Sequence, residues 1–151
     1  MDIFIKYLDK RKGTIEAIKD YDNMQFIIDR TENDIKDAYE DMTSLKSVNL
    51  NGLPKAHNPK AGEDSIINSI EKISVLETRY DDAMEYMKWF GPAWQRLSED
   101  ERYILKTFYN SRYGERLDAI YDICEKLGIE RTTAYKRKNK ALTKLEKMLF
   151  G

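Results

Sequence analysis

Two heptad patterns, separated by a stretch rich in Pro and Gly, constrain the fold of this chain most strongly. The first places apolar or small residues at alternating steps of three and four: Tyr21, Met24, Ile28, Thr31, Ile35, Ala38, Met42 and Leu45. The second repeats every seven residues, with a partner three places on: Ile66, Ile73, Tyr80, Met87 and Trp94, with Leu76, Ala83, Phe90 and Leu97. Such spacing gives a helix one apolar seam for packing against another helix. We therefore predict a long, coiled-coil-like antiparallel helical hairpin.

The segment between the two patterns, SVNLNGLPKAHNPKAGEDS, contains two Pro and two Gly. Pro removes a backbone donor and Gly permits turns, so we expect a non-helical linker near residues 47–63. We also expect Gly13 to mark a bend or break, and Gly91–Pro92 to interrupt the second long helix. The two seams are compatible with packing inside one chain and with dimerisation, and the sequence leaves both alternatives open.

The residues after the hairpin predict three shorter helices. Ser98 and Glu101 have the spacing of a capping box at the start of the first of these helices. An apolar-periodic stretch, LDAIYDICEKL, then leads through Gly128 into a basic segment. With only three Pro and seven Gly in 151 residues, the chain is expected to be all-α. We predict a helical arm at residues 1–95 and a separate helical module at 96–151.

Composition argues against several classes of protein. No apolar run reaches the roughly 20 residues that span a bilayer, and the N-terminal residues lack the features of a signal peptide, so a cytoplasmic location without membrane contact is expected. One Cys and one His cannot form a zinc cluster. No carboxylate pair, phosphate-binding glycine loop or nucleophile arrangement is evident, so we expect no cofactor and no enzymatic activity. Cys124 is expected to be a small core residue.

The net charge of −1 hides an asymmetry along the chain. Residues 1–95 contain 13 Lys or Arg and 18 Asp or Glu, whereas residues 96–151 contain 13 and 9. Residues 130–147 alone contain seven basic and two acidic residues. Because the local field of a patch attracts a polyanion, this segment predicts a DNA-binding helix, with a merely solvated basic face as the alternative.

The segment DICEKLGIERTTAYKRKNKALTKL has the layout of a helix-turn-helix. Its first helix has an apolar face at Ile120, Ile123 and Leu127, and Gly128 suits the turn. The residues of the second helix that are expected to face inward are Ala134, Ala141, Leu142, Leu145 and Leu149. Those able to point outward are Arg131, Thr132, Tyr135, Lys136, Lys138 and Lys140. We predict that base edges are read by Arg131, Thr132 and Lys136, because the first two turns of a recognition helix enter the major groove. The complete set of candidate DNA-binding residues is Arg131, Thr132, Thr133, Tyr135, Lys136, Arg137, Lys138 and Lys140, of which Tyr135, Arg137, Lys138 and Lys140 are expected to contact phosphates.

LSEDERYIL followed by ICEKLGIERTTAYKRKNKALTKL resembles region four of bacterial sigma factors, which binds the promoter −35 element. The whole layout is similar to sigma-like regulators of phages and prophages of Gram-positive bacteria, in the style of the ArpU and RinA late-gene activators. The resemblance implies a sequence-specific transcriptional regulator of phage or prophage genes, with a recognition helix at 130–149. One departure is Glu130, which stands where sigma factors usually place Ser or Thr.

The partners expected of such a regulator are double-stranded DNA, RNA polymerase and a second copy of the chain bound through the hairpin arm. Two other functions remain open from the sequence. One is a DNA-packaging factor of the small-terminase type, which also combines a helix-turn-helix with a helical oligomerisation region. The other is a sigma-like module that binds RNA polymerase without binding DNA.

Overall fold

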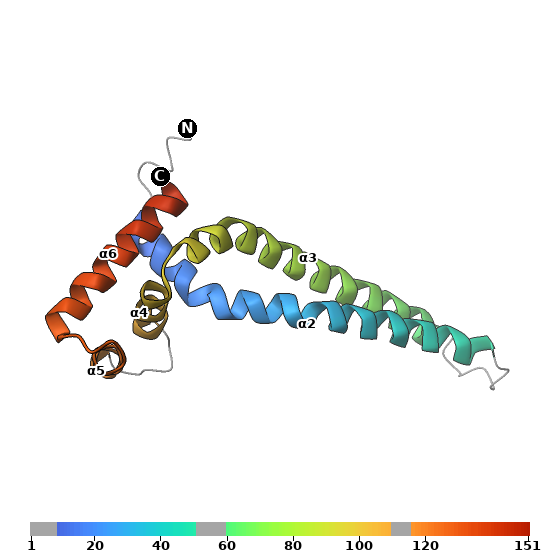
Figure 1. Ribbon diagram of the computed structural model, residues 1–151. Coiled ribbons are helices and arrows are strands. Elements are labelled where there is room, and N and C mark those ends of the chain that lie inside the picture. Colours follow the sequence, from blue (N-terminus) through green and yellow to red (C-terminus); the bar gives the residue numbers. More distant parts are fainter. Residues whose placement is uncertain (1–8, 51–59, 110–115) are drawn as a thin grey trace. The chain divides into compact units, whose positions relative to one another are not determined.

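Helices make up the regular structure of the residues that the computed structural model describes, 9–50, 60–109 and 116–151 (Figure 1). These helices are α2 (Lys10–Leu50), α3 (Lys60–Arg96), α4 (Glu99–Tyr109), α5 (Arg116–Leu127) and α6 (Arg131–Phe150). Within these ranges no residue belongs to a strand. The predicted all-helical class is therefore confirmed.

The two long helices extend further than the sequence predicted. α2 continues through Leu50 and α3 begins at Lys60, so both ends of the linker expected at 47–63 are helical. Residues 51–59, which include both linker prolines, lie outside the described residues. Gly62 costs a helix only about 1 kcal/mol, and the carboxylate of Glu63 in the first turn of α3 suits the positive end of the helix dipole.

Pro92 lies inside α3 and does not interrupt it, contrary to the prediction for Gly91–Pro92. A proline in a helix interior removes one backbone hydrogen bond and costs about 3 kcal/mol. The following turn buries Ala93 and Trp94, which are only 8% and 4% exposed. Burial of these side chains offsets the cost of the proline, and the helix continues to Arg96.

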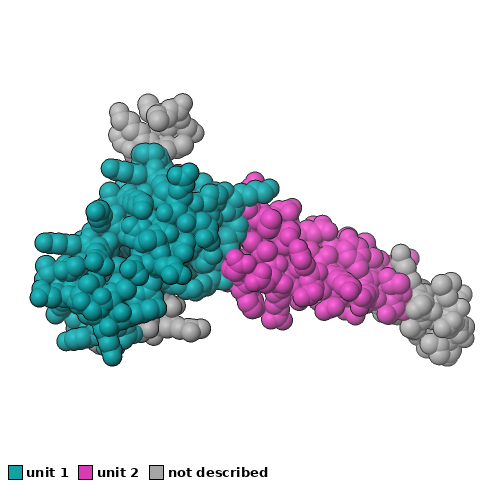
Figure 2. Space-filling model, in the orientation of Figure 1, with its two compact units in different colours: residues 1–22, 86–151 teal, residues 23–85 magenta. Residues whose placement is uncertain are grey.

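The chain forms two compact units (Figure 2). Each of them contains parts of α2 and α3. Unit 1 consists of Met1–Asp22 and Tyr86–Gly151, and unit 2 of Asn23–Glu85. The predicted boundary between residues 95 and 96 thus falls inside unit 1. Unit 1 has 19 basic and 14 acidic residues, and unit 2 has 7 and 13. The positive charge of the chain therefore belongs to unit 1.

Unit 2 consists of antiparallel segments of α2 and α3 (Figure 1). Thr31 and Ala38 of the first heptad seam are buried, as are Ile73 and Ala83 of the second. Tyr80 donates a hydrogen bond of 2.8 Å to the carboxylate of Glu32. The seam residues of this unit whose side chains are described are therefore buried or half-buried within a single chain.

The main core of unit 1 joins the beginning of α2 and the end of α3 to α4 and α6. Its buried residues are Ala17, Ile18, Phe90, Ala93, Trp94, Leu97, Leu105, Ala141, Leu142 and Leu145. The ring of Phe90 stacks on Tyr86 and on Trp94, with centroid distances of 5.2 and 5.4 Å. The last turns of α3, predicted to belong to an arm, therefore support α6.

Gly13 lies in continuous helix, so it does not break α2. A Cβ atom at this position would lie 3.1 Å from Cζ of Phe150, tighter than an ordinary contact. The missing side chain lets α2 pass close to the end of α6. α2 itself starts at a cap, because the Asp9 carboxylate accepts a 3.0 Å hydrogen bond from the N–H of Lys12.

Candidate nucleic-acid interface

α4, α5 and α6 pack together around a second apolar cluster in unit 1. Its buried residues are Ile104, Ile120, Ile123 and Ala134. Cys124, predicted to be a small core residue, is half-buried and packs against this cluster. The cluster holds α5 and α6 in a fixed orientation relative to each other, because each of the three helices contributes to it.

The turn between α5 and α6 depends on Gly128, whose φ is +61°. Only glycine adopts this left-handed conformation without a steric penalty. The N–H of Ile129 donates a 3.3 Å hydrogen bond to the carbonyl of Cys124, which satisfies one carbonyl at the end of α5. Gly128 thus ends α5 and lets α6 begin three residues later.

Glu130 occupies the N-cap position of α6 in an extended conformation, and its side chain makes no capping hydrogen bond. Its backbone carbonyl accepts a 2.9 Å bond from the N–H of Ala134. α6 therefore begins within one residue of the helix predicted at 130–149, but without the side-chain cap that Ser or Thr would supply.

The inward face of α6 agrees with the prediction. Ala134, Ala141, Leu142 and Leu145 are at most 2% exposed, and Leu149 packs against the main core. They are spaced by three, four and seven residues, so they share one face of the helix. α6 is therefore held in place along its length, which leaves the opposite face to solvent.

The candidate DNA-binding residues of α6 differ in how exposed they are. Five of them are exposed: Arg131, Thr132, Lys136, Arg137 and Lys140. Thr133 is half-buried. The exposed group includes all three residues predicted to read base edges.

Tyr135 and Lys138 differ from the outward orientation predicted for them. Tyr135 is half-buried and packs against the second apolar cluster, with its ring centroid 6.2 Å from that of Phe108. The Lys138 ammonium lies 4.2 Å from the centre of the Phe108 ring. Position 138 is four residues after the buried Ala134, so helical spacing turns it toward α4. The guanidinium of Arg131 lies 6.0 Å from the Tyr135 ring, which places Tyr135 behind a candidate base-reading residue.

A shallow groove of about 240 Å³ separates the beginning of α4 from the exposed side of α6. Arg137 and Lys140 line one wall, and Ser98, Asp100 and Glu101 line the other, with Ile104 between them. Carboxylates on one wall reduce the positive potential of the other at distances within a Debye length, about 8 Å at physiological salt. Lys136 is also exposed on α6 but does not line this groove.

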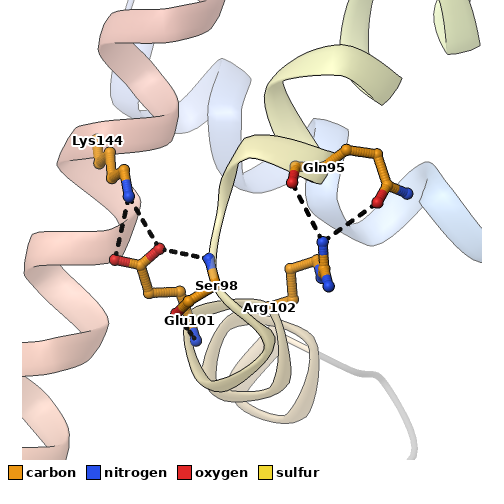
Figure 3. A network of polar contacts seen from close by, with 5 residues as sticks. All are labelled: Gln95, Ser98, Glu101, Arg102 and Lys144. Atoms are coloured by element: carbon orange, nitrogen blue, oxygen red, sulfur yellow. Dashed lines mark hydrogen bonds and ion pairs between the residues drawn. The ribbon is translucent and has the colours of Figure 1, made fainter.

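The predicted capping box at the start of α4 is confirmed and is also tied to α6 (Figure 3). The N–H of Ser98 donates to the Glu101 carboxylate at 2.9 Å, and the N–H of Glu101 donates to the Ser98 hydroxyl at 3.2 Å. Lys144 of α6 forms an ion pair with the same carboxylate at 3.2 Å. Glu101 therefore caps α4 and holds α6 at once.

The pKa of the Glu101 carboxyl reflects these contacts. Partial burial alone would raise its pKa, but hydrogen bonds from the Ser98 N–H and the Lys144 ammonium together lower it below the ordinary glutamate value. The ionised form is thus the one that the folded chain favours. A proton on Glu101 would weaken both the cap and the contact to α6.

Sequence reasoning missed two residues that hold α6 in position, Lys144 and Arg11. Lys144 was counted only as part of the basic segment, and Arg11 was assigned to the arm. The Arg11 guanidinium donates to the hydroxyl of Thr143 at 2.8 Å and lies 3.3 Å from the carboxylate of Glu146. Arg11 and Glu146 are 135 residues apart, and no local spacing rule could have paired them.

Two features are absent from the described residues, a cluster of metal ligands and a membrane-spanning helix. Within residues 9–50, 60–109 and 116–151, no group of three or more His, Cys, Asp or Glu could hold a metal ion. Over the same ranges, no helix is both long and apolar enough to cross a membrane. Comparisons of the chain with protein-family models, with curated proteins and with solved structures find no match.

Proposed function

We propose that this chain is a sequence-specific DNA-binding transcriptional regulator of phage or prophage genes, and that it inserts α6 into the major groove. The observation that carries the proposal is the exposed face of α6. Thr132, Lys136 and Lys140 are exposed on it, Arg131 is exposed in the first turn of the helix, and the sequence from Arg131 to Leu145 contains no acidic residue. A helix that is anchored on one face and cationic on the other suits a groove lined by phosphates.

In this proposal α5, the turn at Gly128 and α6 form the helix-turn-helix, and α4 supports it. The resemblance of these residues to sigma region four supports the same assignment. Unit 2 is then the hairpin arm that contacts RNA polymerase or a second copy. Its charge of 7 basic and 13 acidic residues suits a role away from the phosphate backbone.

Arg131 and Tyr135 form the part of the site to which we assign recognition of the DNA sequence. Arg131 lies in the first turn of α6, where a side chain can reach base edges, and we propose that the ring of Tyr135, 6.0 Å from the guanidinium, helps to position it. An arginine that is positioned in advance loses less conformational entropy when it pairs with a guanine edge. Lys140 lies nine residues further along α6, about 14 Å at 1.5 Å per residue, and is assigned to a phosphate.

The test compares Arg131→Ala with Lys140→Ala in the full chain. A preferred duplex is first selected from a random library, and both variants are titrated on it and on a scrambled duplex at several salt concentrations. We expect Arg131→Ala to cost about 1–3 kcal/mol on the selected duplex only, relaxing preference at one position. Lys140→Ala should weaken both duplexes equally and lower the salt slope by about one contact.

The outcome separates this function from the alternatives left open by the sequence. If both variants bind like the wild type while thermal melts show them folded, the exposed face of α6 is only solvated. Failure of the wild type to bind any duplex at low salt, combined with binding to RNA polymerase, would select the polymerase-binding module. A ring-shaped oligomer with little sequence preference would select the packaging factor.

A further inference from the structure

The basic turn Lys10–Lys12 at the beginning of α2 lies beside the last turns of α6 (Figure 1). Arg11 contacts the side chains of Thr143 and Glu146, and the Lys10 ammonium donates a 3.2 Å bond to the carbonyl of Gly151. Gly13, the residue after this turn, approaches Phe150 closely and belongs to the same contact between α2 and α6. Residues from opposite parts of the sequence thus form one surface within unit 1.

Arg11 changes the charge of that surface. Glu146 is the single acidic residue in the sequence of α6, and its carboxylate pairs with the Arg11 guanidinium. Lys140 and Lys147 are exposed on α6, and Lys12 is exposed on α2. The three cations of the Lys10–Lys12 turn outnumber the two carboxylates that contact it, Asp9 and Glu146, which leaves the local charge positive.

The position of this surface along α6 decides what it could meet on DNA. Thr143 follows Arg131 by twelve residues, about 18 Å at 1.5 Å per residue. The major groove is about 12 Å wide, so a helix that places Arg131 at base edges carries Thr143 to the groove wall or beyond it. Phosphates, rather than bases, line that region.

We infer that the Lys10–Lys12 turn extends the DNA interface of α6 and binds the phosphate backbone that flanks the major-groove site. This inference rests on the proposed function, and it adds a segment more than 100 residues away from the helix-turn-helix in sequence. Arg11 is the positioning residue, because its contacts to α6 fix the turn. Lys12 supplies an exposed charge for a phosphate oxygen, and its backbone N–H is already engaged by Asp9.

Lys12→Ala tests the inference in the full chain, with Lys88→Ala as the matched control. Both lysines are exposed on helices of unit 1, so the two variants lose the same charge, but Lys88 lies in α3 and not in the turn beside Thr143. The probe is a mixed-sequence duplex of three helical turns, because a phosphate contact does not require a preferred sequence. Affinity is measured over a range of salt concentrations, and tryptophan fluorescence melts verify that each variant is folded.

We expect Lys12→Ala to lower the slope of log affinity against log salt by about 0.9, the value for one phosphate contact, and Lys12→Arg to restore it. Lys88→Ala should keep the wild-type slope. Equal slopes for Lys12→Ala and Lys88→Ala, with the wild type still bound to DNA, would overturn this inference and leave the proposed function standing. No binding by the wild type at low salt would overturn both.

Discussion

Removal of the Phe90 ring should destabilise the core that supports α6, although it changes no residue of the candidate interface. Phe90 is fully buried, and its ring contacts those of Tyr21, Tyr86 and Trp94 at centroid distances of 5.7, 5.2 and 5.4 Å. The same core contains Leu142 and Leu145 on the inward face of α6. Phe90→Ala therefore leaves a cavity between α3 and the helix that carries the exposed cations.

The size of the effect follows from the burial of the ring. Replacing a buried Phe by Ala typically costs about 3–5 kcal/mol, from lost transfer free energy and the cavity left behind. Each aromatic pair contributes about 0.5–1.5 kcal/mol beyond burial, and four such pairs would be lost, including one with Trp89 at 6.5 Å. We expect a value in the upper part of the 3–5 kcal/mol range, which is a large fraction of the roughly 5–15 kcal/mol that stabilises a typical domain.

Urea denaturation of the full chain, followed by tryptophan fluorescence, measures this cost. Both tryptophans, Trp89 and Trp94, lie in unit 1, so their emission reports on that unit. Tyr121→Ala is the matched control, because it removes an aromatic ring from the same unit but from a side chain that is 69% exposed. We expect the control to change the free energy of unfolding by no more than about 0.5 kcal/mol.

A loss for Phe90→Ala within 1 kcal/mol of the control would refute the reasoning. It would mean that the last turns of α3 do not stabilise α6, and that residues 96–151 are an independent module as the sequence suggested. A large loss would instead show that a fragment starting at residue 96 lacks part of its own core.

Two further predictions concern the elements that orient α6. Because the folded-state pKa of Glu101 is lowered, its contribution to stability is present above the ordinary glutamate pKa of about 4.3 and is lost as the pH falls through the lower folded value. Glu101→Gln should therefore flatten the pH dependence of the unfolding free energy in that acid range by less than about 1 kcal/mol, since the side chains of Lys144 and Glu101 are 48% and 27% exposed and solvent screens the pair. An unchanged profile in urea titrations at several pH values would contradict this. Gly128→Ala should cost about 1–2 kcal/mol, because φ is +61° while no atom lies within 4 Å of the added Cβ. Gly128→Asn should cost less, and equal losses of thermal stability for the two variants would show that backbone conformation is not the cause.

Much of the local structure could be predicted from the sequence, because it depends on spacing within a few residues. The heptad positions are buried or half-buried wherever their side chains are described, as Ile73 and Ala83 illustrate. The Ser98–Glu101 capping box and the inward face of α6 also follow local rules, the first from a three-residue spacing and the second from helical periodicity.

The composition of unit 1 could not be predicted in this way. A heptad pattern shows that Phe90 and Trp94 face something apolar, but it does not identify the partner, and here they pack with α6 as well as with α2. A glycine at position 13 suggests a helix break when only the sequence is considered. In the structure it instead allows α2 to pass close to Phe150. For Lys138, proximity to the aromatic ring of Phe108 on another helix determines the orientation, and a charge pattern along α6 contains no information about that ring.

The pairing of Arg11 with Glu146 has a consequence for how the chain is made. Ala17 and Ile18 share a core with Leu142 and Leu145 as well as with α3, so their burial is complete only after α6 has been synthesised. Closing a loop ten times longer costs about 2 kcal/mol more in chain entropy, so contacts 135 residues apart form late compared with those among α4, α5 and α6. While the ribosome is still adding residues 97–140, the start of α2 therefore exposes apolar surface, and this segment of the nascent chain is open to chaperones and proteases.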